Sequence, residues 1–273
     1  MPTRTLQVPI TLSSGGAQGA TPATLSRFLT IDIGGSGLKA AVVDRKGKMI
    51  GDRVRVKTPH PCPPDVLLEH LLKLVEPLAS FDCVAVGFPG VVRDGTIVTA
   101  PNLGTEDLRG FDLATALAER LGRPVRVAND AEVQGLAAIE GTGLEMVITL
   151  GTGFGTALFE DGRSLPHLEL AHHPFRKGKT YEQLLGQKAL EKAGVEKWNR
   201  RLERAIHTLR KLVHYDKLYL GGGNARKVGF QLDGDTTVVS NRLGVKGGVA
   251  LWLGARWYTK NAHRRRSSPA RTA

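Results

Sequence analysis

The chain has 273 residues, of which 41% are hydrophobic and 23% charged, a composition typical of a soluble globular protein with one large or two modest domains. It contains no apolar run close to the ~20 residues of a membrane span, and its first 27 residues lack the cationic and apolar regions of a secretory signal. Its two cysteines, which form no CxxC pair, indicate neither a disulfide framework nor a zinc cluster. We therefore expect a cytoplasmic protein that does not bind membranes.

The formal net charge of +12 is distributed unevenly along the chain. Residues 254–273 include six basic and no acidic side chains, and a second basic stretch extends over residues 176–211. Basic surfaces attract polyanions, including nucleic acids. For the terminal run a solvated, disordered tail is the simpler interpretation, so specific nucleic-acid binding is not expected.

Strands and helices are predicted to alternate along most of the chain. Residues 1–27 are rich in Ser, Thr, Gly and Ala and are predicted to be disordered. The elements expected after them are strands at 28–33, 38–44 and 53–56, a helix at 65–78, a strand at 83–88, a helix at 113–121, a strand at 125–128 and a helix from about 129. The order then restarts with strands at 146–150 and 156–159, a helical region at 181–213 broken near 186 and 194, a strand at 217–220 and a helix at 247–258. This alternation predicts α/β layers whose sheets are covered on both faces.

Two segments, 31–39 and 149–156, share one layout, in which a buried strand turns through glycines and returns as a second apolar segment. The first glycine of each turn, Gly34 or Gly151, precedes by ten residues the aspartate that ends the returning segment. Glycines let the backbone approach a ligand closely, and the amide groups of such a turn form a nest for phosphate oxygens. Two such turns in matching halves predict a phosphate-binding cleft between two related lobes.

These motifs resemble those of the ROK family of sugar kinases, in the actin-like ATPase superfamily, and the resemblance covers residues 28–257. Its most similar branch is that of the polyphosphate glucokinases and glucomannokinases. The matching motifs are Asp32–Lys39 and Leu150–Gly155 for the two phosphate loops, Gly221–Gly223 for the adenosine-contacting turn, and Pro101–Leu103, Asn129–Ala131 and Glu169–His172 on the sugar side. The resemblance implies two actin-like (ribonuclease H-like) α/β lobes, with mixed sheets flanked by helices and a ligand cleft between them.

The implied domain organisation is a small lobe at 28–128 and a large lobe at 129–245. A C-terminal helix at 246–260 is expected to pack back on the small lobe. The disordered N-terminal extension of residues 1–27 and a basic disordered tail at 261–273 flank these parts, and a homodimer is expected.

The activity implied by the resemblance is transfer of a phosphoryl group from ATP or inorganic polyphosphate to the 6-hydroxyl of glucose or a related hexose. Asp130 is the expected general base, because this reaction needs a carboxylate within hydrogen-bond reach of the attacking hydroxyl. A cap of the following helix is the structural alternative for Asp130. The residues expected to contact the sugar are Asn102, Asn129, Asp130, Glu169, His172 and Glu182.

On the donor side, Asp32 ends a buried strand beside a glycine turn, where an unpaired carboxylate would be costly. The resemblance implies that it orients Mg²⁺ through water. The residues expected to bind phosphate are Asp32, Gly34, Gly35, Ser36, Gly37, Lys39, Thr152 and Gly153. Those expected to bind a nucleotide are Gly221, Gly222, Gly223 and Asn224. The alternatives are an ordinary hairpin turn at Thr152 and Gly153, and a solvent-facing Lys39.

Three departures from the family pattern affect these expectations. The zinc-binding cysteines that normally follow the position of His172 are absent, so no structural zinc is expected. Ala171 replaces a glycine, and His167 stands where the polyphosphate-using branch tends to have asparagine, which leaves both donors open. The alternative function is a non-catalytic, sugar-binding regulator with a nucleic-acid-contacting tail, although the presence of Asp32 and Asp130 favours a kinase.

Overall fold

The computed structural model describes residues 24–101, 103, 106–240 and 243–254. The elements of the first half are β1 (Arg27–Gly34), β2 (Gly37–Asp44), β3 (Met49–Val56), α1 (Pro64–Val75), β4 (Cys83–Phe88), β5 (Val92–Arg93), β6 (Thr96–Ile97), the 3₁₀ turn η1 (Glu106–Leu108), α2 (Leu113–Leu121) and β7 (Val125–Asn129). The expected disordered tail at 261–273 and most of the expected N-terminal extension lie outside the described residues. Residues 24–27, however, belong to the fold, since Leu25 is buried and Arg27 begins β1.

The elements of the second half begin directly after β7. They are α3 (Asp130–Leu136), β8 (Leu144–Leu150), β9 (Phe154–Glu160), β10 (Arg163–Ser164), η2 (Leu170–His172), β11 (Pro174–Arg176), β12 (Lys179–Thr180), α4 (Tyr181–Leu185), α5 (Gln187–Ala193), α6 (Val195–Val213), β13 (Lys217–Gly221), η3 (Ala225–Lys227), β14 (Thr236–Val238) and α7 (Leu243–Leu253). The predicted breaks near Gly186 and Gly194 are confirmed, because α4, α5 and α6 are separate helices.

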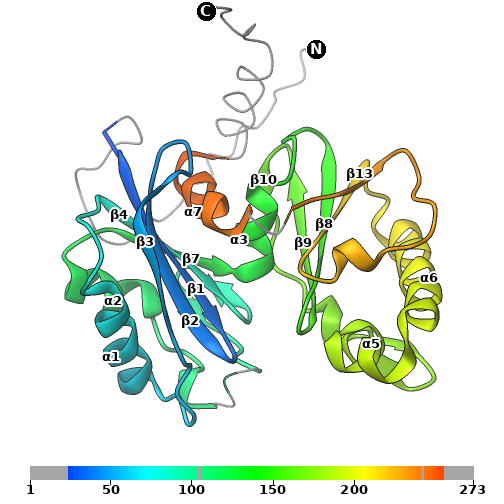
Figure 1. Ribbon diagram of the computed structural model, residues 1–273, viewed down its shortest axis with the longest axis horizontal. Helices are drawn as coiled ribbons and strands as arrows, with labels where there is room; N and C mark the ends of the chain where they lie inside the picture. The colour runs from blue at the N-terminus through cyan, green and yellow to red at the C-terminus, as the bar shows by residue number, and fades with distance from the viewer. Residues whose placement is uncertain (1–23, 102, 104–105, 241–242, 255–273) are drawn as a thin grey trace, which may run out of the picture.

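The strands form two five-stranded sheets, in the orders β3-β2-β1-β4-β7 and β10-β9-β8-β13-β14. Each sheet contains an antiparallel hairpin, β1–β2 or β8–β9, whose first strand also pairs in parallel with a later strand. Figure 1 shows the sheets in separate halves of the molecule, with α1 and α2 outside one, α5 and α6 outside the other, and α3 and α7 between them. The predicted α/β class with mixed, helix-flanked sheets is confirmed.

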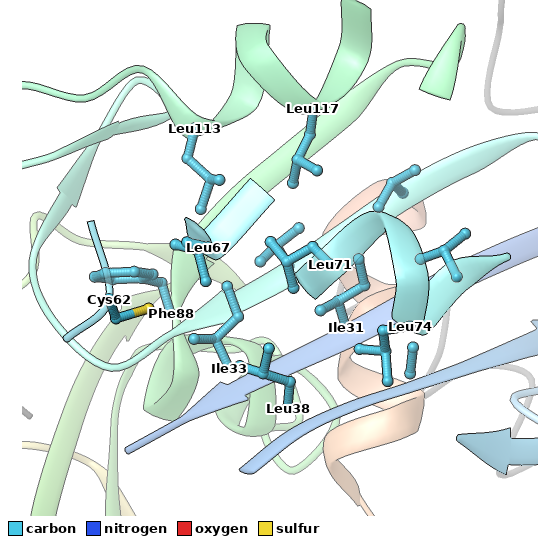
Figure 2. Close-up of a cluster of buried hydrophobic side chains, with 14 of the residues drawn as sticks. Ile31, Ile33, Leu38, Cys62, Leu67, Leu71, Leu74, Phe88, Leu113 and Leu117 are labelled. Carbon is cyan, nitrogen blue, oxygen red and sulfur yellow. The ribbon is translucent and has the colours of Figure 1, made fainter. Parts of the chain in front are cut away.

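The core of the first half determines which way Asp32 points. Alternate residues of β1, including Ile31 and Ile33, join a buried cluster with Leu67 and Leu71 of α1 (Figure 2). Because successive strand residues point to opposite faces of a sheet, Asp32 lies on the other face. On that face α7 packs against β1 and β4.

The C-terminal helix α7 approaches its neighbours closely through two glycines. An ideal Cβ on Gly247 would lie 1.7 Å from the carbonyl oxygen of Val133 in α3, and one on Gly248 would lie 2.3 Å from Cγ2 of Thr30 in β1. The prediction of a helix at 247–258 was wrong in its bounds. The helix begins at Leu243 and ends at Leu253, where Gly254 takes a left-handed φ of 82° that favours termination.

Within the described ranges, none of the helices combines the length and the apolar character that crossing a membrane would require.

Candidate active site

A row of paired residues crosses the first sheet at the carboxyl end of β1. Asp32 pairs with Lys39 of β2 on one side and with Gly87 of β4 on the other, and Lys39 pairs with Arg55 of β3. Side chains at paired positions share a face of the sheet. Asp130 lies against this row, since an ideal Cβ on Gly87 would be 3.5 Å from its Cα atom. The absent side chain of Gly87 thus leaves space between Asp32 and Asp130.

The backbone at Asp130 is held by a capping box at the start of α3. The side-chain oxygen of Asn129 accepts a hydrogen bond from the amide of Ala131 at 2.8 Å, and Glu132 accepts one from the amide of Asn129 at 3.3 Å. The Asn129 amide group also donates to the carbonyl of Gly90 at 3.1 Å. The cap is therefore Asn129, which is buried and serves the scaffold in this conformation.

The carboxylate of Asp130 has a perturbed affinity for protons. Partial burial and the negative charge of Asp32 raise its pKa to about 6, with a further contribution from Glu169. A hydrogen bond from the Ala131 amide and the positive charge of His167 act in the opposite direction. A carboxylate with a pKa near the working pH is suited to accept a proton during reaction.

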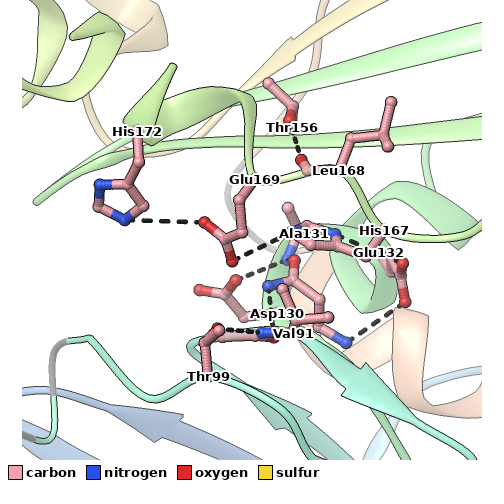
Figure 3. Close-up of polar contacts among 12 residues, drawn as sticks. Val91, Thr99, Asp130, Ala131, Glu132, Thr156, His167, Leu168, Glu169 and His172 are labelled. Carbon is pink, nitrogen blue, oxygen red and sulfur yellow. Dashed lines mark hydrogen bonds and ion pairs between the residues drawn. The ribbon is translucent and has the colours of Figure 1, made fainter. Parts of the chain in front are cut away.

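Two predicted sugar contacts, Glu169 and His172, lie on the side of the site that belongs to the second half. Nε2 of His172 is 3.7 Å from Oε2 of Glu169. The Glu169 carboxylate is near enough to Asp130 to influence its titration, and Figure 3 shows the two carboxylates facing the same space. The structure thus brings Asp130, Glu169 and His172 together. The predicted contact Asn102 lies outside the described residues.

Glu182, also predicted to contact the sugar, lies beside the second glycine turn. An ideal Cβ on Gly153 would be 2.6 Å from Oε2 of Glu182. A carboxylate therefore adjoins the turn that was expected to bind phosphate.

The second glycine turn, residues 151–153, is held by two neighbouring segments. The amide of Gln187 donates to the carbonyl of Thr152 at 3.1 Å. The side-chain amide of Asn224 donates to the carbonyl of Gly151 at 3.2 Å and to the side chain of Gln187 at 2.7 Å. Asn224 is buried, so in this conformation the predicted nucleotide contact supports the turn, whereas Thr152 is exposed.

The third glycine turn, Gly221–Gly223, lies directly on the second one. Gly222 has a φ of 88°, and an ideal Cβ there would lie 2.2 Å from the carbonyl oxygen of Leu150. Only glycine fits this close approach of β13 to the end of β8. The second and third turns therefore form one assembly.

The first glycine turn is the tip of the β1–β2 hairpin, where Gly34 pairs with Gly37 and residues 35 and 36 form the turn. The Thr58 hydroxyl donates to the carbonyl of Gly34, and Nε2 of His60 lies 2.8 Å from the carbonyl oxygen of Gly35. These contacts fix the turn from the segment that follows β3.

Two cations lie beside the first turn, one expected from the sequence and one not. Lys39, predicted to bind phosphate, forms an ion pair with Asp32 at 2.8 Å. Arg55, which sequence reasoning missed, lies over the turn, because its Nε would be 3.1 Å from an ideal Cβ on Gly37. The sequence pattern that could have indicated Arg55 is its position between the apolar Val54 and Val56 in the strand after the first turn.

The Mg²⁺ implied by the family fits the acidic side of this row. The Asp32 side chain is about half exposed, at 52%, and its charge raises the pKa of Asp130 despite the ion pair with Lys39. A half-exposed carboxylate suits Mg²⁺, which proteins commonly hold through one or two carboxylates, water and substrate phosphates.

No cluster of three or more His, Cys, Asp or Glu side chains that could hold a metal occurs in the part of the chain that the structure describes. The absence of structural zinc stays a prediction. It rests on the sequence, in which Cys62 and Cys83 lie far from His172, whereas structural zinc needs four ligands. Stoichiometric zinc after chelator washing, measured by elemental analysis, would contradict it.

Comparison with known proteins identifies the family. Residues 28–166 match the ROK family. The chain is 32% identical over 226 residues to the polyphosphate glucokinase of Mycobacterium tuberculosis (strain CDC 1551 / Oshkosh), covering 79% of this chain and 85% of that protein. It is 36% identical over 142 residues to the N-acetylmannosamine kinase of Escherichia coli (strain SE11), covering 50% of this chain and 48% of that protein.

Solved structures agree with this match. The crystal structure of the inorganic polyphosphate/ATP-glucomannokinase from Arthrobacter sp. strain KM superimposes with a TM-score of 0.72 at 32% identity, covering 82% of this chain and 97% of that one. A ROK family glucokinase from Streptomyces griseus gives a TM-score of 0.67 at 18% identity, covering 82% and 98%, and so shares the fold. The chain belongs to the ROK family and has its actin-like fold. Within that family it is a sugar kinase of the hexokinase type.

Proposed function

We propose that this enzyme transfers a phosphoryl group from ATP or inorganic polyphosphate to the 6-hydroxyl of glucose or a closely related hexose. The observation that carries the proposal is the position of Asp130. This carboxylate, with its raised pKa, lies between the Asp32 row at the first glycine turn and the pair formed by Glu169 and His172. A proton acceptor between a phosphate site and a group of hydrogen-bonding side chains is what a sugar kinase requires.

In this mechanism Glu169 and His172 hydrogen-bond hydroxyls of the sugar and orient its reactive hydroxyl toward Asp130. Asp130 accepts the hydroxyl proton as the oxygen attacks the terminal phosphorus, and the bond from this phosphorus to the bridging oxygen of the donor breaks, which releases ADP or a polyphosphate shortened by one unit. Amide groups of the first glycine turn bind the phosphoryl oxygens, on which negative charge is spread in the transition state. Mg²⁺, when bound through water at Asp32, adds charge stabilisation. Closure of the two halves would exclude water and suppress hydrolysis of the donor.

The charges around the first turn support a polyanionic donor. Arg55 lies over the turn and Lys39 follows it, so two cations stand beside the proposed phosphate site. A second basic stretch runs through α5 and α6, and a long polyphosphate could contact many of its cations at once if this surface borders the cleft. The alternative is an ordinary solvated helix face, with ATP as the only donor. The names of the relatives, a polyphosphate glucokinase and a polyphosphate/ATP-glucomannokinase, give the same support. We therefore propose that polyphosphate is accepted besides ATP.

The test is an assay that crosses a panel of hexoses with ATP and with polyphosphates of several chain lengths, at low and high salt. The expected result is a 6-phosphorylated hexose with both donors, and a Michaelis constant for polyphosphate that rises steeply with salt. No turnover of any hexose with either donor would overturn the proposed function. Turnover with ATP alone at every chain length and low salt would overturn the polyphosphate part.

The homodimer and the cytoplasmic location expected from the sequence stay predictions. Light scattering of the purified chain measures the mass of the particle in solution, and a mass close to one chain would contradict the homodimer.

A further inference from the structure

One buried histidine lies between two carboxylates that come from different parts of the chain. Nδ1 of His167 is 3.4 Å from Oε1 of Glu132, and its Nε2 is 3.5 Å from Oε1 of Glu169. The His167 side chain is 6% exposed. Figure 3 shows the ring between the start of α3, which carries Asp130 and Glu132, and the segment that carries Glu169.

The second oxygen of each glutamate is engaged in the active site. Oε2 of Glu132 accepts the amide hydrogen of Asn129 in the cap before Asp130, and Oε2 of Glu169 lies 3.7 Å from Nε2 of His172. His167 therefore bridges the helix of the proposed base and the proposed sugar-binding pair.

We infer that His167, as a buried cation, is a positioning residue that holds the Glu169 carboxylate against the base-bearing helix and thereby sets the affinity for the sugar. This inference rests on the proposed function, because it takes Glu169 as a sugar contact. The charge of His167 also lowers the pKa of Asp130, but on the sugar it acts only through Glu169 and Glu132.

The charge of the ring follows from its neighbours. A neutral imidazole has one N–H, so one of the two carboxylates would face a lone pair, whereas the imidazolium presents an N–H to each. The contacts are ion pairs in this conformation, since the buried Nδ1 atom makes no hydrogen bond within the described residues. Burial opposes the charged form, but the close contacts with the negatively charged Glu132 and Glu169 raise the pKa of His167 to about 9. In return, His167 lowers the pKa of Glu169. The other titratable groups facing this cluster are Asp130 of α3, and His172 beyond Glu169.

Loss of this proton has a defined direction. Above a pH of about 9 the ring is neutral, so the facing carboxylates repel each other and Glu169 is released from its position. Because the folded-state pKa lies above the ordinary value of 6.5, the ring stabilises the fold fully below pH ~6.5, and this contribution is lost as the pH rises through about 9. Sugar affinity and stability should fall over the same alkaline range.

The experiment compares the wild-type chain with His167→Gln, Glu132→Gln and the matched control His173→Gln, an exposed histidine nearby. Sugar binding is measured by calorimetry without donor, and kcat and KM for the sugar with saturating donor, from pH 6 to 10. For the wild type we expect the sugar Kd to rise roughly tenfold between pH 7.5 and 9.5 as the cation is lost. For His167→Gln we expect a Kd roughly tenfold weaker at pH 7 and flat with pH, with kcat within about threefold of wild type. His173→Gln should match the wild type.

Glu132→Gln keeps the histidine but removes one of its carboxylates, so the alkaline rise in sugar Kd should move about one pH unit lower. This second variant tests the inference if His167→Gln does not fold. A wild-type Kd profile in both variants would overturn the inference, as would a loss confined to kcat.

Unfolding in urea separates this inference from the proposed function. The free energy of unfolding of the wild type should fall from pH 7 to 9.5, and this slope should be absent in His167→Gln. If the substitution left the pH dependence of the free energy of unfolding unchanged, His167 would not be a buried cation. If the slope behaves as expected but no hexose binds the wild type, the proposed function fails and the sugar-positioning role fails with it.

Discussion

The two glycine turns share a layout in the sequence but have opposite electrostatic surroundings in the structure. The first, residues 34–37, has Lys39 and Arg55 beside it and is the tip of a hairpin. The second, residues 151–153, has the carboxylate of Glu182 beside Gly153. A repeated backbone layout therefore does not imply repeated charge, because the neighbouring side chains come from other elements.

The turns also differ in how they are supported. The second turn is joined to the third through Gly222 and through the buried amide of Asn224. The first turn is held by Thr58 and His60. We expect the first turn to receive the terminal, most negative phosphates of the donor and the second and third turns to act as a rigid wall. In this division the first turn stabilises the charge on the transferred phosphoryl group, and the proton transfer depends on Asp130.

The largest expected effect tests that last statement. Asp130→Asn keeps the shape of the side chain but removes its ability to accept a proton. We expect a loss of roughly 10²–10⁴-fold in kcat with the sugar Kd nearly unchanged, measured by initial rates and calorimetry. A variant with more than half of the wild-type kcat would show that Asp130 is not the general base.

The rigid wall is tested by Gly222→Ala. An alanine here would have to adopt a left-handed φ, and its Cβ would collide with the backbone of Leu150. We therefore expect the free energy of unfolding to fall by roughly 2–5 kcal/mol. The matched control is Gly110→Ala, which has a φ of 80° but nothing within 4 Å of the new Cβ, and should lose only about 1–2 kcal/mol. Equal losses in urea denaturation would show that the two turns do not support each other.

The fall of activity at acid pH tests whether the pKa of Asp130 is raised. Since burial and Asp32 raise the pKa of Asp130 to about 6, the base is protonated and inactive below that pH. We expect kcat/KM to fall about tenfold per pH unit below pH ~6. Circular dichroism over the same range controls for acid unfolding. Constant kcat/KM down to pH 4.5 would contradict the raised pKa.

The smallest expected effect concerns the cations of the first turn. Arg55→Ala removes an exposed cation, so we expect the KM of the donor to rise roughly three- to tenfold at low salt and less at high salt. Arg53→Ala, two residues away on the same strand, is the matched control and should change the donor KM by less than twofold. If the two substitutions raised the donor KM equally, Arg55 would have no specific role at the first turn, and the effect would come from the general surface charge.

Elements with a local signal could be predicted from the sequence. The strand at 83–88 is a continuous apolar run and the strand at 28–33 is apolar apart from Thr30 and Asp32, and both are strands of the first sheet. The caps and breaks at Asn129, Gly186 and Gly194 are also local, and α3 begins and α4 ends where they indicate. The family motifs brought Asp130, Glu169 and His172 into one hypothesis because their order along the chain is characteristic.

What could not be predicted depends on contacts between distant segments. Arg55 matters because strand pairing places it over Gly37. Glu132 and His167 are 35 positions apart in number, and only the folding of the second half brings them together. The start of α7 was predicted at Gly247, but the helix begins at Leu243. Glycine disfavours helix locally, whereas close packing on α3 requires Gly247 inside the helix.

The position of α7 has a consequence for the order in which the enzyme matures during synthesis. Residues 243–253 cover β1 and β4, including Phe28 and Cys83, and also pack on the helix that begins with Asp130. These surfaces are made first and covered last, and a nascent chain exposes them while the ribosome adds more than a hundred residues. We expect chains released before residue 243 to bind chaperones or aggregate, so a ribosome yields a competent kinase only after it has made residues 243–253.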